Sequence, residues 1–188
     1  MKIGIVSDTH GCPETWRTIF DAYLSRVDMI LHAGDLLYHG PRNAIPAEYD
    51  PKNLAVELNR CPVPIIAASG NCDSEVDSMV IDFPIQSPYA HVFADGMNIV
   101  INHGHLLDES SRRDAARRYR ASLFVTGHTH IAECFRDGDT VFLNPGSPSM
   151  SKRDDRKGTI ALLEDRFVRV ISIIDGDTLF TENLRPRA

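Results

Sequence analysis

Several features that would point to particular protein classes are missing from this sequence of 188 residues. It has four cysteines, and no two of them form a CxxC pair, so we expect a reduced, cytoplasmic protein rather than a disulfide-stapled one. No apolar run approaches the length of a membrane span, and the run at residues 1–6 is too short for a signal peptide. Internal repeats and low-complexity tracts are absent too. We therefore expect a single domain over residues 1–188.

The sequence also lacks an excess of positive charge. Its formal net charge is −6, which does not attract polyanions over long distances. An extended nucleic acid and a membrane are therefore not expected as partners. A small phosphorylated substrate is compatible with this charge, because a bound metal can invert the local field. Whether the chain forms a homo-oligomer is left open.

The first half alternates strands with helices. Short β-branched or apolar runs at residues 2–6, 28–32 and 63–68 predict buried strands. Pro13 is suited to the first turn of one helix, and Asp50-Pro51 to the cap and first turn of another. This order indicates α/β structure with a parallel sheet and right-handed crossovers.

The second half is richer in strands, with one helix expected at residues 109–119. Asp95-Gly96 and Asp137-Gly138 are typical of hairpin turns. We expect a second, mostly antiparallel sheet packed on the first. The strand candidates are residues 90–94, 97–102, 123–126, 131–136, 140–144, 158–163 and 167–173.

Polar clusters stand at the ends of several expected strands, where ligands of open α/β sheets bind. They offer carboxylate, amide and imidazole groups, a mixture that suits Mn, Fe, Zn, Co or Ni better than calcium. Each cluster alone is a weak signal, and their joint occurrence in this order is the strong one. The clusters are Asp8-Thr9-His10, Gly34-Asp35, Gly70-Asn71, Asn102-His103-Gly104-His105 and Gly127-His128-Thr129-His130.

DxH, GD, GN, HG and GHxH in that order resemble the calcineurin-like metallophosphoesterase superfamily. The stretches 39–43, 70–76 and 144–147 are similar to its small bacterial phosphodiesterases of the YfcE type, which are themselves similar to the retromer subunit Vps29. The resemblance implies a four-layer α/β/β/α sandwich of two packed mixed sheets, with a dinuclear metal centre at one edge.

The resemblance also implies a ligand set for two divalent metal ions. Mn²⁺ is the expected metal, with Zn²⁺, Fe²⁺, Ni²⁺, Co²⁺ or Mg²⁺ as alternatives. A hydroxide bridging the metals would attack the phosphorus, with Asp35, Asn71 and His103 acting through the metals. The first metal would take Asp8, His10 and His130, the second Asn71, His103 and His128, and Asp35 would bridge both.

The position after Asn71 departs from the wider family. Many members carry a histidine there that is thought to help the leaving group, whereas this chain has Cys72, as the bacterial subgroup does. Cys72 is therefore placed near the leaving group without an assigned acid role, because a thiol with an ordinary pKa near about 8.5 is not an obvious acid for this step.

Other residues keep alternative interpretations. His105 could replace His103 as a ligand, whereas His32 is expected to be a packed strand residue. His39 and Arg42 could contact substrate or solvent. The basic run at residues 112–120 is interpreted as a solvated helix face, and Cys12 as a buried, inert thiol.

Three functions are weighed. Hydrolysis of phosphate diesters is favoured, and hydrolysis of monoesters by the same site is the alternative. A non-catalytic, Vps29-like protein-binding scaffold is the third. The resemblance implies that such scaffolds have lost ligands, including the one that matches His10. Because this chain keeps Asp8 and His10, the enzyme is preferred.

Overall fold

The computed structural model describes residues 1–185 and begins with the alternation that the sequence predicts. Pro13 opens the first helix, and the Asp50 side chain caps the second by accepting a hydrogen bond from the Asn53 N–H. A π-helical segment, Phe20–Leu24, continues the first helix. The elements of this half are β1 (Lys2–Val6), α1 (Pro13–Ile19), β2 (Met29–His32), α2 (Pro51–Asn59), β3 (Ile65–Ala68), α3 (Asp77–Val80) and β4 (Ile85–Gln86).

These strands form the parallel half of a seven-stranded sheet in the order β12-β11-β10-β1-β2-β3-β4. The other half comes from the end of the chain. There β10 pairs with β1 in antiparallel register, Lys2 opposite Glu164, and β11 and β12 follow outward. The bounds of these strands are β10 (Thr159–Glu164), β11 (Phe167–Ser172) and β12 (Thr178–Asn183).

The second sheet has five strands in the order β5-β6-β7-β9-β8. Two of its four pairings are parallel and two are antiparallel, so the expectation of a mostly antiparallel second sheet is wrong. The cause is the helix α4 (Glu109–Arg118), which connects β6 to β7 by the long crossover that parallel neighbours need. The strands are β5 (Ala90–Ala94), β6 (Met97–Ile101), β7 (Leu123–Val125), β8 (Glu133–Asp137) and β9 (Thr140–Asn144).

The hairpin turns lie close to their predicted positions. Asp95 and Gly96 form the loop between β5 and β6, both with positive φ. The second turn is shifted by one residue, because Asp137 pairs with Thr140 and leaves Gly138 and Asp139 as the loop.

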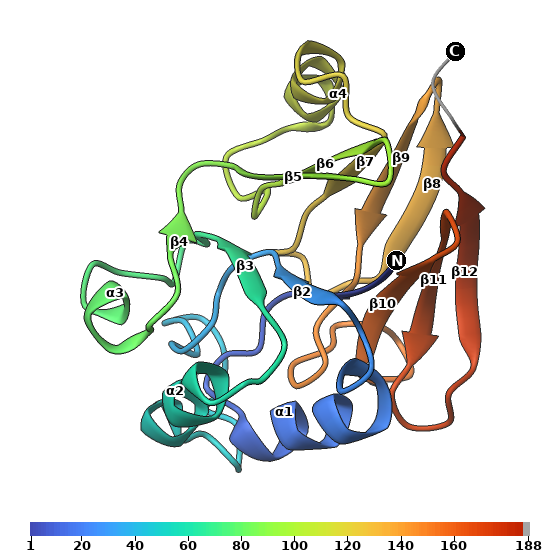
Figure 1. Cartoon of the computed structure of the whole chain (residues 1–188). Helices are drawn as coiled ribbons and strands as arrows, with labels where there is room; N and C mark the ends of the chain where they lie inside the picture. The colour runs from blue at the N-terminus through green and yellow to red at the C-terminus, as the bar shows by residue number, and fades with distance from the viewer. Residues whose placement is uncertain (186–188) are drawn as a thin grey trace.

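Three apolar clusters separate four layers, as the family resemblance implies (Figure 1). Ile3 and Ile5 of β1 face the layer between the two sheets, whereas Val6 faces α1 and α2 with Trp16. On the far side, Phe124 of β7 packs beneath α4. Within residues 1–185, no helix combines the length and the apolar character needed to cross a membrane.

Candidate metal centre

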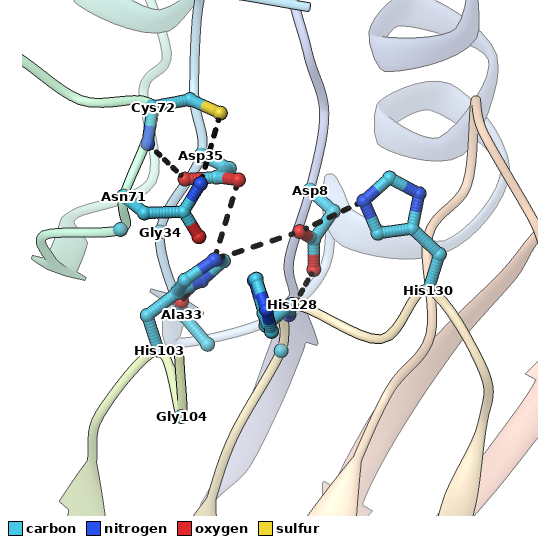
Figure 2. A network of polar contacts seen from close by, with 12 residues as sticks. Asp8, Ala33, Gly34, Asp35, Asn71, Cys72, His103, Gly104, His128 and His130 are labelled. Atoms are coloured by element: carbon cyan, nitrogen blue, oxygen red, sulfur yellow. Dashed lines mark hydrogen bonds and ion pairs between the residues drawn. The ribbon is translucent and has the colours of Figure 1, made fainter. Parts of the chain in front are cut away.

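The predicted ligands come from the loops that follow parallel strands of both sheets. Figure 2 labels all of them except His10. In the first sheet the loops after β1, β2 and β3 carry candidates, and in the second sheet those after β6 and β7 do. The structure brings all seven predicted ligands to this common edge: Asp8 and His10 after β1, Asp35 after β2, Asn71 after β3, His103 after β6, and His128 and His130 after β7.

The backbone of these loops is strained at the candidate ligands. Asp8, His10, Asp35, His128 and His130 all have positive φ, between 46° and 70°. For residues with a Cβ, this left-handed conformation costs about 1–2 kcal/mol each. Such strain persists only where the surroundings impose it, and it concentrates at functional sites.

Two glycines of the motifs allow the loops to approach one another. A Cβ at Gly70 would collide with the Asp35 carboxylate, and one at Gly127 would collide with the Ser7 side chain. The Gly in GN and the Gly in GHTH are therefore required by contacts between loops, which gives these short motifs a physical basis.

The first group of ligand atoms is Asp8 Oδ1, His10 Nε2 and His130 Nε2. Asp8 Oδ1 lies 3.6 Å from His10 Nε2 and 3.3 Å from His130 Nε2, and the two nitrogens lie 3.0 Å apart. These atoms surround one point, as ligands of a single cation do.

Backbone carbonyls orient the imidazoles. His10 Nδ1 lies 2.6 Å from the carbonyl oxygen of Tyr38. In the same way, His103 Nδ1 lies 2.7 Å from that of Ala33, and His130 Nδ1 lies 2.8 Å from that of Met150. A carbonyl only accepts, so each Nδ1 carries the proton and each Nε2 of a neutral ring presents a lone pair to the site.

The carboxylates are oriented in the same manner. Asp8 Oδ2 accepts a hydrogen bond of 3.0 Å from the N–H of His128, and Asp35 Oδ1 accepts one of 2.8 Å from the N–H of Cys72. Each carboxylate therefore keeps its second oxygen for the interior of the site. Asp35 Oδ2 lies 3.3 Å from His103 Nε2 and 3.8 Å from His10 Nε2.

Two buried atoms at this point have no hydrogen-bond partner among residues 1–185, namely Asp8 Oδ1 and His103 Nε2. Buried polar atoms without partners are costly, and bound cations would satisfy them. Burial alone would lower the pKa of His103, but the carboxylates of Asp35 and Asp8 outweigh burial and raise it to about 9. The site thus attracts positive charge, and its oxygen and nitrogen donors fit divalent metals.

The remaining predicted ligands lie at the outer edge. Asn71 is exposed, and its Nδ2 lies 3.2 Å from Cys72 Sγ, which leaves its amide oxygen free. The ring of His128 is half-buried, with its centroid 5.3 Å from that of His103. The His105 ring lies 5.5 Å from that of His103. Neither His105 nor His128 is part of any group of converging ligand atoms found within residues 1–185, whereas His103 is. This favours His103 over His105.

A cleft of about 660 Å³ opens beside these residues. Its lining includes Asp35, Cys72 and His128, together with the cationic side chains of Arg42 and Lys152. Burial, followed by the nearby Asp35 carboxylate, raises the pKa of the Cys72 thiol to about 12. Cys72 therefore presents a neutral thiol to the cleft.

The structure shows the surroundings of the residues for which the sequence left alternative interpretations. His32 is fully buried, with Nδ1 accepting from the Gly34 N–H and Nε2 lying 3.0 Å from Thr9 Oγ1, so its prediction as a packed residue is confirmed. His39 packs edge-on against the rings of Tyr38 and Tyr49. Cys12 is buried, as expected, and burial raises its pKa to about 11.

The basic run on α4 is only partly solvated. Arg113 and Arg117 pair with acidic residues at the surface, as a solvated face predicts. Arg112 instead lies over the rings of Phe135 and Phe142, at 5.4 Å from each centroid, and pairs with Glu133.

The sequence motifs did not assign a role at the site to Asp73. Its carboxylate accepts hydrogen bonds of 2.7–2.8 Å from the N–H groups of Asp35, Leu36 and Gly70, and so ties the loop after β2 to the loop after β3. Burial outweighs these bonds and raises the pKa of Asp73 to about 6. The sequence feature that could have indicated this role is an acidic residue three positions after the glycine of the GN motif.

Comparison with known proteins identifies the family. The model of the calcineurin-like phosphoesterase superfamily domain matches residues 1–166. Phosphodiesterase YfcE of Escherichia coli K12 is 33% identical over 187 residues, which cover 99% of this chain and 100% of that protein. A probable metallophosphoesterase of Methanothermobacter thermautotrophicus is 29% identical over 195 residues, covering 100% of this chain and 94% of that one.

Solved structures agree with this assignment. The structure of YfcE, a phosphoesterase from E. coli, superposes with a TM-score of 0.87 at 30% identity and covers 98% of this chain and 100% of that chain. Vps29 of Entamoeba histolytica, solved in complex with Zn²⁺, has a TM-score of 0.68 at 18% identity, covers 98% of this chain and 100% of that chain, and shows the shared fold alone. The chain therefore belongs to the calcineurin-like phosphoesterase superfamily and is a phosphoric ester hydrolase.

Proposed function

We propose that this chain is a metal-dependent phosphodiesterase that acts on a small phosphorylated substrate. One observation carries the metal dependence, namely two buried groups of converging ligand atoms that share Asp8, one with His10 and His130 and the other with Asp35 and His103. The choice of diesters is supported by the likeness to a relative named as a phosphodiesterase over nearly the whole chain.

The proposed centre holds two divalent cations. Asp8, His10 and His130 would hold the first cation. Asn71, His103 and His128 would hold the second, with Asp35 shared by both. The position of Asp35 supports this sharing, because its free oxygen lies between His10 Nε2 of one set and His103 Nε2 of the other, 3.8 and 3.3 Å away.

When bound, such a pair of cations supplies Lewis acidity, lowering the pKa of a water from 15.7 toward about 7 and offsetting charge on the phosphoryl group. The protein's own groups prepare the site for this chemistry. Backbone carbonyls hold three Nε2 lone pairs inward, and backbone N–H groups aim one oxygen of each carboxylate. Arg42 and Lys152 line the cleft, where their charges favour a phosphate anion.

No side chain is assigned as a covalent nucleophile. In the protein without metal, burial and the Asp35 carboxylate raise the pKa of the Cys72 thiol to about 12, and Thr9 is buried and donates its hydroxyl hydrogen to the Leu36 carbonyl. The oxygen and nitrogen donors fit several divalent metals, and among these we propose Mn²⁺ from the resemblance to the small bacterial phosphodiesterases. We propose the cytoplasm as the location, since the four cysteines are free.

The test is reconstitution of metal-stripped protein with each divalent metal. Folded protein should bind about two metals per chain and recover hydrolysis of bis-nitrophenyl phosphate, and recover less hydrolysis of nitrophenyl phosphate. Better hydrolysis of the monoester would instead identify a phosphomonoesterase. Folded protein that binds no metal at any concentration would contradict the whole assignment, and two bound metals without activity on either ester would favour a binding scaffold.

A further inference from the structure

A second pocket adjoins the catalytic cleft. It has a volume of about 670 Å³ and lies between α2, α3 and the loop after β2. Tyr38, Cys72 and Ser74 line both this pocket and the cleft, so the two spaces meet along these side chains. Its apolar wall consists of Leu37, Tyr49, Ala55, Val56, Val76 and Val80.

The wall of this pocket leaves apolar surface exposed to solvent. Val76, directly before α3, is 63% exposed, and Val80, its last residue, is 46% exposed. Val56 on α2 is 39% exposed. Exposed apolar side chains gathered around one hollow mark a binding surface more strongly than the same residues scattered singly. The volume also falls within the range of about 300–1,000 Å³ that is typical of small-molecule sites.

The pocket lies next to the metal centre, and Cys72 stands between the two. The N–H of Cys72 donates to Asp35 Oδ1 at 2.8 Å, so the residue that separates the two spaces is bonded to the carboxylate we assign as bridging. An ester whose phosphate lies in the cleft would therefore bring one of its organic groups to the mouth of the pocket. Lys52 and Asp77 line the pocket as well, and both can meet polar atoms on an otherwise apolar group.

We propose that this pocket binds an apolar, aromatic organic group of the phosphate ester while the phosphate lies in the adjoining cleft. The proposal rests on the proposed function, because it assumes that the cleft takes the phosphate. It gives the enzyme a preference for esters with aryl or comparable ring substituents over esters with small alkyl groups.

The experiment measures binding and turnover in the metal-loaded protein. Calorimetry would compare methylphosphonate with 1-naphthylphosphonate, and kinetics would compare methyl and phenyl nitrophenyl phosphodiesters, which share one leaving group. We expect the aromatic member of each pair to be favoured about tenfold or more, a size typical of an apolar pocket.

Two substitutions on α3 test whether the aromatic group binds in this pocket. Val80→Glu places a charge on the pocket wall and should abolish the aromatic preference while leaving the values for the methyl compounds unchanged. Met79→Glu is the matched control, because Met79 is 82% exposed and is not among the residues that line the pocket. It should keep the preference of the parent protein.

The outcomes separate the two proposals. Turnover of the methyl diester without any aromatic preference would overturn the pocket alone. An aromatic preference that survives Val80→Glu would place the ring elsewhere and overturn it as well. Failure to bind either phosphonate and to hydrolyse either diester would overturn the proposed function together with the pocket. A change of oligomeric state in Val80→Glu with unchanged phosphonate binding would assign the pocket to a second copy of the chain instead.

Discussion

The inner and outer parts of the metal centre are built differently. In the inner part, Asp8, His10, Asp35, His103 and His130 are buried, and backbone groups orient each side chain. In the outer part, Asn71 is exposed, and Cys72 and His128 are half-buried. The inner part is thus organised before any ligand arrives, whereas the outer part lines the cleft where substrate enters.

This difference indicates that the two parts contribute to different properties, namely metal binding and turnover. Buried, oriented donors decide whether metal binds, because they cannot move to compensate for a lost neighbour. Exposed donors can adjust, and their contribution depends on what occupies the cleft. Substitutions in the inner part should therefore weaken metal binding more than those in the outer part, which should chiefly alter rates and substrate preference.

The largest effect is expected for Asp35→Asn. An amide keeps the shape but removes the charge between His10 and His103, so both metals should bind more weakly. We expect kcat/KM to fall about 10³-fold or more, the size seen when one strong electrostatic group is lost from an active site. Elemental analysis and diester kinetics measure the two effects. Full metal occupancy with unchanged turnover would place the bridge at another residue.

The next largest effect is expected on stability at low pH and concerns His32, whose ring contacts Thr9 and Gly34 beside the inner part. Burial lowers its pKa from an ordinary value of 6.5 to about 4. Between these values the unfolded chain binds more protons than the folded one, so the free energy of unfolding should decrease as the pH falls from 6.5 to 4. The loss amounts to about 3 kcal/mol at most, and this contribution of His32 is fully present above pH 6.5.

Chemical denaturation at a series of pH values measures this loss, with His32→Gln as the variant that cannot titrate. The glutamine can still accept from the Gly34 N–H and donate to Thr9. Its stability should depend less on pH than that of the parent protein in the same range. Parallel curves for the two proteins would show that His32 does not take part in acid destabilisation.

A smaller effect is expected for Asp73→Asn, which tests how the inner part is held. The amide nitrogen cannot accept hydrogen bonds, so at least one of the N–H groups of Asp35, Leu36 and Gly70 loses its partner. We expect metal affinity to fall about 10- to 100-fold, as for other residues that orient metal ligands. Asp21→Asn, an exposed change on the π-helical segment, is the control. Unchanged metal affinity in Asp73→Asn would remove the positioning role.

The smallest effect is expected for Cys72→Ala, at the outer part. Because the thiol is neutral and a nitrophenolate leaves without a proton, hydrolysis of aryl diesters should change by less than about threefold. Cys72→His is the informative partner, since an imidazole can protonate an alkoxide. It should raise kcat/KM for alkyl diesters relative to aryl diesters. Loss of aryl hydrolysis in Cys72→Ala without metal loss would make the thiol catalytic.

Local patterns placed the candidate ligands better than they placed the strands within the sheets. Every predicted ligand follows a predicted strand within a few residues, so placing β1, β2, β3, β6 and β7 was enough to bring the ligands together. In contrast, β4 has only two residues, and the nearly continuous apolar run of β10 indicates that both its faces are buried without showing which strand it joins. Periodicity specifies the faces of a strand rather than its neighbours.

The sequence by itself determined the strand–helix order of residues 2–68, the helix start at Pro13, the cap at Asp50, the turn at Asp95-Gly96 and the set of candidate metal ligands, because each depends on residues close together in the chain. Only the tertiary structure decided that β10 to β12 complete the first sheet, that Asp73 ties two loops together, and that an apolar pocket opens beside Cys72. These features arise from contacts between segments distant in sequence, where packing and hydrogen bonding choose among partners that local chemistry leaves equivalent.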